Sequence, residues 1–206
     1  MQKIKNLSLL AVVFCVFTFS GFGCSAALNA LENLQRLKFK LGEVHNFQLA
    51  GVQISHITSP SYLSVFEAAS LATAFAQGRL PASFTLDVLA KNPNDGTGGT
   101  KQATATMTSM RWRLLIDGTE TVAGAIEQPV TIPGVGQETI IPVGVSVDLV
   151  QFFNAIGYER ILNLAFGIGG STGNAGKLQL KITPEVSTFL GPIVMPEITA
   201  VTYEFR

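Results

Sequence analysis

The stretch FTLDVLAKNPNDGTGG, residues 84–99, decides how the central part of the chain folds. Over residues 84–90, apolar side chains occupy every second position, which is the period of a β-strand with one buried face. Asn92, Pro93 and Asn94 follow directly, and a glycine-rich segment comes after them. The sequence therefore predicts a strand that stops abruptly at the Asn-Pro-Asn tripeptide.

The tripeptide has a physical reason to end a strand. Pro93 has no N–H to donate to a neighbouring strand, and its ring pushes Asn92 into an extended conformation. Asn92 and Asn94 can bind nearby backbone groups through their side chains and tolerate a left-handed backbone. We interpret the tripeptide as a structural corner. The alternative is a polar rim that presents two amides to a sugar or a lipid headgroup.

The period of two recurs on both sides of this stretch. Asp117 and Gly118 give a strong signal for a two-residue hairpin. Seven or eight short strands separated by turn signals are typical of an all-β sandwich. The predicted strands cover residues 37–41, 47–57, 84–90, 106–117, 121–132, 139–147, 177–188 and 198–205.

Two segments interrupt the β pattern. Residues 61–77 and 148–168 place apolar side chains near helical spacing, and Asp148 is suited to cap the second of them. We therefore expect a β-sandwich with two short helical insertions.

The N-terminus is predicted to carry an export signal. Residues 1–23 combine two lysines, an apolar run of about 13 residues and a stretch rich in small residues, which is typical of a signal peptide. Gly23 and Cys24 resemble the lipobox at which bacterial lipoproteins are cleaved and lipidated. The alternatives are an ordinary secretory signal, cut near Gly23 or Ala26, and a retained amphiphilic anchor.

Cysteine usage favours lipidation of Cys24. The second cysteine, Cys15, lies in the apolar run and would be removed, so the mature chain cannot form an internal disulfide. Ser25 follows Cys24, which in lipoproteins favours the outer membrane, facing the periplasm. The predicted organisation is a lipoprotein signal peptide at 1–23, a lipidated N-terminus and tether at 24–36, and a sandwich domain at 37–206.

Charge and motifs exclude several function classes. The chain has 14 basic and 14 acidic residues without a basic cluster, so nucleic acid is not an expected partner. The G-x-S-x-G match at 169–173 has no histidine after it, and we expect a flexible loop there rather than a nucleophile. His45 and His56 lack the neighbours of a metal site. No catalytic residue, metal or cofactor is predicted, and Trp112 is expected in the core rather than as a platform for a sugar.

The order of these pieces resembles a known family. Asn92-Pro93-Asn94, the strand MRWRLLIDG (110–118), VAG (122–124) and VTIPGVGQETIIPVGVSV (130–147) are similar to the late embryogenesis abundant group 2 family, also called the water-stress and hypersensitive-response domain. The resemblance implies an immunoglobulin- or fibronectin-III-like sandwich with a binding or protective role and no catalysis. The two helical segments depart from the short members of that family.

Two functions remain open at this stage. The first is a lipid-anchored envelope module that binds, scaffolds or protects, with a lipid or protein partner. The alternative is a periplasmic carrier of lipid or another hydrophobic ligand, held in a slot that the helices line. The predicted lining of such a slot consists of Phe66, Leu71, Phe75, Phe152, Phe153 and Phe166.

Overall fold

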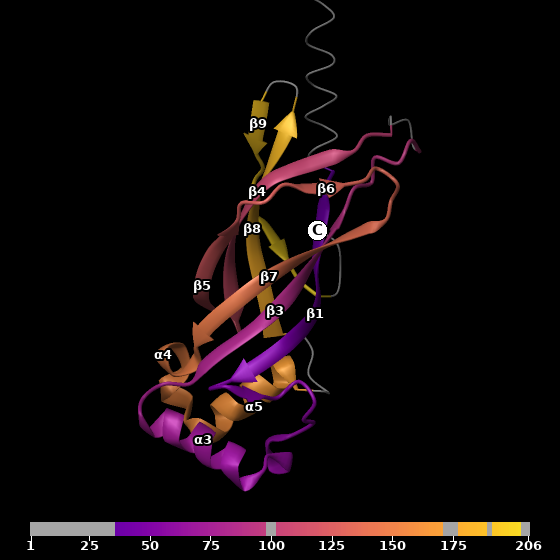
Figure 1. The fold of residues 1–206 in the computed structure, drawn as a ribbon. Coiled ribbons are helices and arrows are strands. Elements are labelled where there is room, and N and C mark those ends of the chain that lie inside the picture. Colours follow the sequence, from indigo (N-terminus) through magenta and orange to yellow (C-terminus); the bar gives the residue numbers. More distant parts are fainter. Residues whose placement is uncertain (1–35, 98–101, 171–176, 189–190, 203–206) are drawn as a thin grey trace, which may run out of the picture.

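Strand β3 (Pro81–Lys91), which contains the first part of the quoted stretch, lies inside an antiparallel sheet. Its burial alternates along its whole length, as its sequence predicts. The computed structural model describes residues 36–97, 102–170, 177–188 and 191–202. Within these ranges the protein is mostly β-sheet (Figure 1).

The first sheet has the strand order β2-β1-β3-β7. β3 and β7 stay in register from Pro81 opposite Asp148 to Lys91 opposite Glu138. β1 is bulged twice against β3, between Leu41 and Val44 and again between His45 and Gln48. Such bulges bend a strand and increase its twist. The other strands of this sheet are β1 (Lys38–Leu49), β2 (Val52–Gln53) and β7 (Glu138–Asp148).

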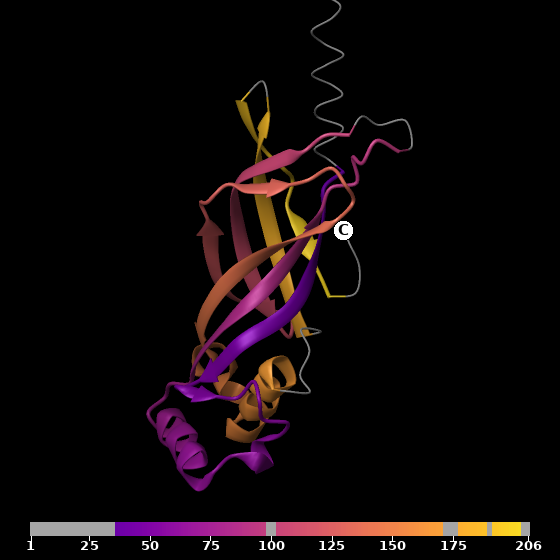
Figure 2. The same ribbon diagram turned by 45° about the vertical axis from the view of Figure 1, so that its right-hand side comes forward.

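The second sheet has the order β10-β8-β4-β5, and two short strands extend it, because β6 pairs with β4 and β9 with β8. Its strands are β4 (Ala105–Ile116), β5 (Thr119–Ile126), β6 (Val130–Ile132), β8 (Leu178–Thr188), β9 (Gly191–Val194) and β10 (Ile198–Ala200). Figure 2 shows the two curled sheets facing one another. Buried side chains from both sheets form one continuous hydrophobic core.

The helices gather at one end of the two sheets, where β1 ends (Figure 1). They are η1 (Pro60–Tyr62), α3 (Val65–Ala76), α4 (Leu149–Phe153), η2 (Asn154–Ile156) and α5 (Tyr158–Gly169). α5 buries seven of its residues, whereas α3 buries Leu71 alone. α5 is therefore part of the core, and α3 lies on its outside.

Both predicted helical segments are helical, but each is divided. The segment predicted over 148–168 breaks at Gly157, whose φ of +80° is a left-handed conformation that ends the preceding turn. In the segment predicted over 61–77, α3 begins only at Val65, because Ser64 caps it. Asp148 accepts hydrogen bonds from Val150 N (3.1 Å) and Leu80 N (2.8 Å), so it caps α4 as predicted.

Two predicted strands are also divided. The strand predicted over 47–57 turns at Ala50 and Gly51, both with positive φ, so it forms the end of β1 and the separate strand β2. Residues 121–132 form β5 and β6, and Pro129 lies in the break between them. Proline cannot donate to a ladder, which explains the interruption. Asp117 and Gly118, both with positive φ, form the two-residue turn from β4 to β5. The prediction of a mostly β protein with short helical insertions is confirmed.

The contact between Phe47 on β1 and Gly169 on α5 joins the helices to the sheet. The Phe47 ring stacks on Phe84, with centroids 5.0 Å apart and planes 5° from parallel. Gly169 lies so close that a Cβ at this position would overlap the Phe47 side chain. The absence of a side chain at residue 169 is therefore what lets α5 lie flat on the ring.

We predict that Gly169→Ala lowers the free energy of unfolding by about 1–3 kcal/mol, because Phe47 is already held by its stack on Phe84 and cannot move aside. The matched control is Gly167→Ala in the same helix, where a Cβ would meet nothing within 4 Å. This control should be neutral or stabilising by up to about 1 kcal/mol, because alanine favours helices over glycine. Denaturant unfolding measures both, and equal stability of the two variants would contradict the packing described.

Candidate functional site

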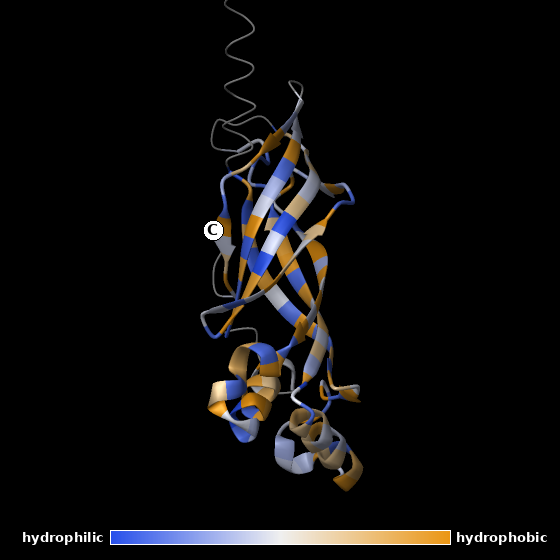
Figure 3. Cartoon of the chain, turned by 90° about the vertical axis from the view of Figure 1, so that its left-hand side faces the viewer, coloured by the Kyte–Doolittle hydropathy of each residue, from blue (hydrophilic) through white to orange (hydrophobic). Residues whose placement is uncertain are grey.

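The surface that stands out lies at the helical end. Tyr62, Val65 and Phe66 are 74%, 84% and 88% exposed, and they follow closely in the chain where η1 passes into α3. We call these three residues the apolar tip. Figure 3 shows α3 as a largely apolar helix at the extremity of the molecule. Exposed patches of large apolar side chains often mark sites where a protein contacts another molecule.

A capping box builds the apolar tip. Ser64 Oγ accepts a hydrogen bond from Glu67 N (3.3 Å), and the Glu67 carboxylate accepts from Ser64 N (2.8 Å) and from Ser64 Oγ (2.7 Å). These bonds hold the pKa of Glu67 below its usual value. They also fix the first turn of α3, so Val65 and Phe66 are held outward by a rigid element.

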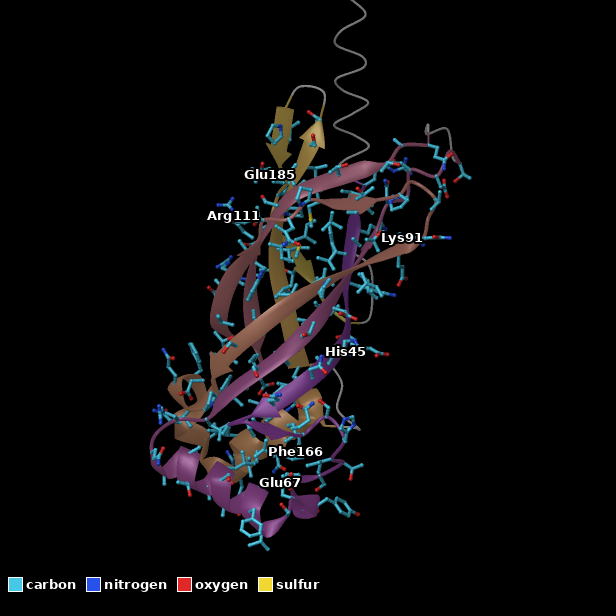
Figure 4. All side chains as sticks on the ribbon, in the orientation of Figure 1. His45, Glu67, Lys91, Arg111, Phe166 and Glu185 are labelled. Carbon is cyan, nitrogen blue, oxygen red and sulfur yellow. The ribbon has the colours of Figure 1, made fainter. Side chains whose placement is uncertain are left out.

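The six residues predicted to line a slot differ in how deeply they are buried. Leu71, Phe153 and Phe166 are buried in the hydrophobic core, and Figure 4 places Phe166 inward from Glu67 at the helical end. Phe75 and Phe152 are half-buried against the same core, and the Phe75 ring lies 5.1 Å from that of Tyr158. Phe66 instead points into solvent as part of the apolar tip. The structure therefore separates Phe66 from the other five.

The Asn-Pro-Asn corner is buried at the other end of β3. Asn92 is 0% exposed, and its amide nitrogen donates to Ala103 O (2.8 Å) and Ile132 O (3.1 Å). Its Oδ1 accepts from Asn94 N (3.1 Å) and Asn94 Nδ2 (2.9 Å). The Asn92 side chain thus ties the loop after β3 to the end of β6. This geometry supports the structural interpretation of the tripeptide.

A second feature lies on the outer face of the second sheet. A hollow of about 650 Å³ opens between β5, β4, β8 and Glu197. Arg113 lies in it and pairs with Glu120 (3.0 Å) and Glu197. The hydrogen bond that Arg113 donates to Glu197 and the charge of Glu120 raise the pKa of Arg113 above its usual value.

Other groups carry no comparable arrangement in the part of the chain that the structure describes. His45 Nε2 lies 2.9 Å from Asp87 Oδ2 as an isolated pair between β1 and β3. No group of three or more metal-type side chains gathers within the described ranges. No helix there combines the length and apolarity needed to cross a membrane. Cys24 and the signal peptide at 1–23 lie outside the described residues.

Sequence reasoning placed Phe66 correctly on a helix but did not single out Tyr62 and Val65. A signal was present, since Tyr62, Val65 and Phe66 flank a capping serine with little charge nearby. The hollow was not predicted, although the alternation of β4 that places Trp112 in the core turns Arg111 and Arg113 outward. Only the register of β4 against its neighbours brings those side chains next to Lys181.

No family model matches the chain, and no curated protein matches it. Among solved structures, the chain is similar to a protein provisionally described as late embryogenesis abundant, at 15% identity and a TM-score of 0.34, over 97% of this chain and 90% of that one. It is also similar to a protein from Archaeoglobus fulgidus (15% identity, TM-score 0.34, 57% of this chain and 80% of that one). A structural-genomics target gives 11% identity and a TM-score of 0.34 over 81% and 87% of the two chains. Overlaps this low decide neither family nor function.

We predict that Asn92→Ala destabilises the fold by about 2–4 kcal/mol, because it leaves the carbonyls of Ala103 and Ile132 without their donor in a buried place. Gln128→Ala, an exposed amide in the nearby β5–β6 connection, should change stability by less than about 0.5 kcal/mol. Denaturant midpoints test the pair. If the Asn92→Ala protein were as stable as wild type, the structural role assigned to the Asn-Pro-Asn corner would be wrong.

Proposed function

We propose that this chain is a non-enzymatic, lipid-anchored binding module of the bacterial cell envelope, and that it engages a protein partner through the apolar tip. The observation that carries the proposal is the exposure of Tyr62 at the end of η1 and of Val65 and Phe66 in the capped first turn of α3. Aromatic side chains on a rigid element are the usual anchors of protein interfaces. Burial of these two aromatic side chains and of Val65 would contribute roughly 5–8 kcal/mol before the costs of association.

The charge around the apolar tip favours a protein over a lipid surface. Helices that lie in a membrane interface are rich in lysine and arginine on their polar face. α3 has no basic residue, and its one acidic residue, Glu67, is engaged with Ser64. An uncharged, aromatic surface of this kind is complementary to a hydrophobic groove rather than to anionic headgroups.

The position of the apolar tip suits a module that reaches away from its anchor. β1 begins at the end opposite the helices (Figure 1) and spans roughly 40 Å over its 12 residues. Lipidation at Cys24 would place the anchor at the far side of a tether of roughly 40 Å when extended. The apolar tip would then be presented to components at a distance from the anchoring membrane, which we propose to be the outer membrane.

The finer assignment of the fold belongs to this proposal. Two antiparallel sheets around one core, and a β3 strand that ends at a buried Asn-Pro-Asn corner, support an immunoglobulin- or fibronectin-III-like member of the late embryogenesis abundant group 2 family. A stress-protective role would follow from that membership. Burial of Leu71, Phe153 and Phe166 in the core supports a binding module over a carrier of hydrophobic ligands.

We predict that Cys24→Ala abolishes fatty-acid labelling of the full-length chain and leaves it at precursor size, because the lipobox is cleaved only before a lipidated cysteine. Two or more acyl chains give stable anchoring, and the unmodified chain would have none. The matched control is Cys15→Ala, which changes a cysteine inside the signal peptide and should leave both readouts unchanged. Fatty-acid labelling that persists in Cys24→Ala would contradict lipid anchoring at this residue.

We predict that a photo-crosslinking benzoylphenylalanine in place of Phe66 forms a discrete adduct with an envelope protein in the living host. The same group in place of Ile140, an apolar side chain 61% exposed on β7, is the matched control and should form none. A further Val65→Asp substitution should reduce the Phe66 adduct at least about tenfold, since it places a charge in the contact.

The remaining outcomes of this experiment are also decisive. An adduct with lipid alone at residue 66 would overturn the protein partner in favour of a membrane contact or a carrier. Protein adducts of equal yield at residues 66 and 140 would indicate non-specific collisions with envelope proteins and would contradict a specific contact at the apolar tip. Mass spectrometry of the adducts distinguishes these results.

A further inference from the structure

The outer face of the second sheet holds a regular array of side chains from three adjacent strands. Arg111 on β4 lies between Ala125 on β5 and Thr183 on β8, and one step along the strands Arg113 lies between Ala123 and Lys181. These side chains alternate with buried neighbours such as Trp112, so they point outward. All of them line the hollow.

The shape of the hollow follows from the strands beneath it. β4 is irregular against β5 between Arg113 and Leu115, and irregular against β8 between Met107 and Ser109. Such irregularities increase the twist of a sheet and curl it. On β5 the floor is made only of Ala123, Gly124 and Ala125. The hollow has a volume of about 650 Å³ above these small side chains, which is enough for a small molecule with one or more rings.

The charges in the hollow are unequally engaged. Arg113 already pairs with Glu120 and Glu197. Within the described part of the chain, the side chains of Arg111 and Lys181 have no ion-pair or hydrogen-bond partner. They occupy diagonal positions on adjacent strands, which places their backbones about 7–8 Å apart. Two long cationic side chains at this spacing can converge on one anionic group.

We propose that this hollow is a binding site for a sugar that carries an anionic group, a phosphate or a carboxylate. Arg111 and Lys181 would bind the anion through charge-assisted hydrogen bonds, which are stronger than neutral ones. Thr183 and Glu197, both on the lining, offer a hydroxyl and a carboxylate to the sugar hydroxyls. The alanines of β5 leave room for the ring. Figure 4 places Arg111 far from the helical end, so this site is separate from the apolar tip.

The test is a titration of the ¹⁵N-labelled full-length chain in detergent micelles, followed by amide chemical shifts, with glucose 6-phosphate, glucuronate and glucose as probes. We expect one or both charged sugars to shift amides of residues 111–113, 123–125 and 181–183. Binding should have a dissociation constant on the order of 1 mM and weaken as salt is raised. Glucose should cause no such change. The two charged probes distinguish a phosphate from a carboxylate ligand.

A charge-matched pair of variants decides whether the site is specific. The double variant Arg111→Ala/Lys181→Ala should weaken binding about tenfold or more, because two charge-assisted bonds are lost. The control Arg79→Ala/Arg160→Ala removes the same charge at the helical end and should bind as wild type does. Equal shifts with glucose, shifts scattered over the surface, or equal weakening in both double variants would each overturn the proposal. Such results would not affect the proposal that the apolar tip binds a protein partner.

Discussion

The outline of the molecule depends on the close approach of α5 to the Phe47 ring. Because Gly169 has no side chain, α5 lies directly on a ring that is itself stacked on Phe84. This contact closes one end of the space between the sheets with a helix that contributes seven residues to the core. α3 is then left with one buried residue and a ring contact between Phe75 and Tyr158. α3 therefore lies outside the closed core, and the apolar tip at its start remains exposed.

Sequence alone predicted the parts of the fold in which local pattern and tertiary environment agree. β3 and β7 alternate cleanly because each has one face in the core along its entire length, and Asp148 was found because a cap is a local feature. The sequence did not predict β9, a four-residue strand that contains Pro192 and exists only by pairing with the end of β8. The break at Gly157 was also missed, since glycine within an apolar helical period signals a stop only weakly.

For the polar residues, the sequence predicted local roles but not contacts with distant parts of the chain. Asn92 could be interpreted from its neighbours, because proline at the next position and asparagine beyond it restrict what the chain can do there. The bonds from Asn92 to Ala103 and Ile132 could not, since they join loops that the sequence does not place together. The same holds for Arg111 and Lys181, which are neighbours only through the register of β4 against β8. Alternation along a strand indicates on which face of the sheet a side chain lies, but not which residues it contacts.

The order of the strands has a further consequence for the way the chain reaches its final state. β3 pairs with β7 and β4 with β8, so most of the ladder joins segments that are far apart along the chain. Folds of high contact order acquire their structure slowly, because distant segments must meet before any of the ladder can stabilise them. The described core also contains no cysteine, so the redox state of the surroundings cannot delay its formation. If the chain is exported as proposed above, slow strand pairing would keep it unfolded during its passage.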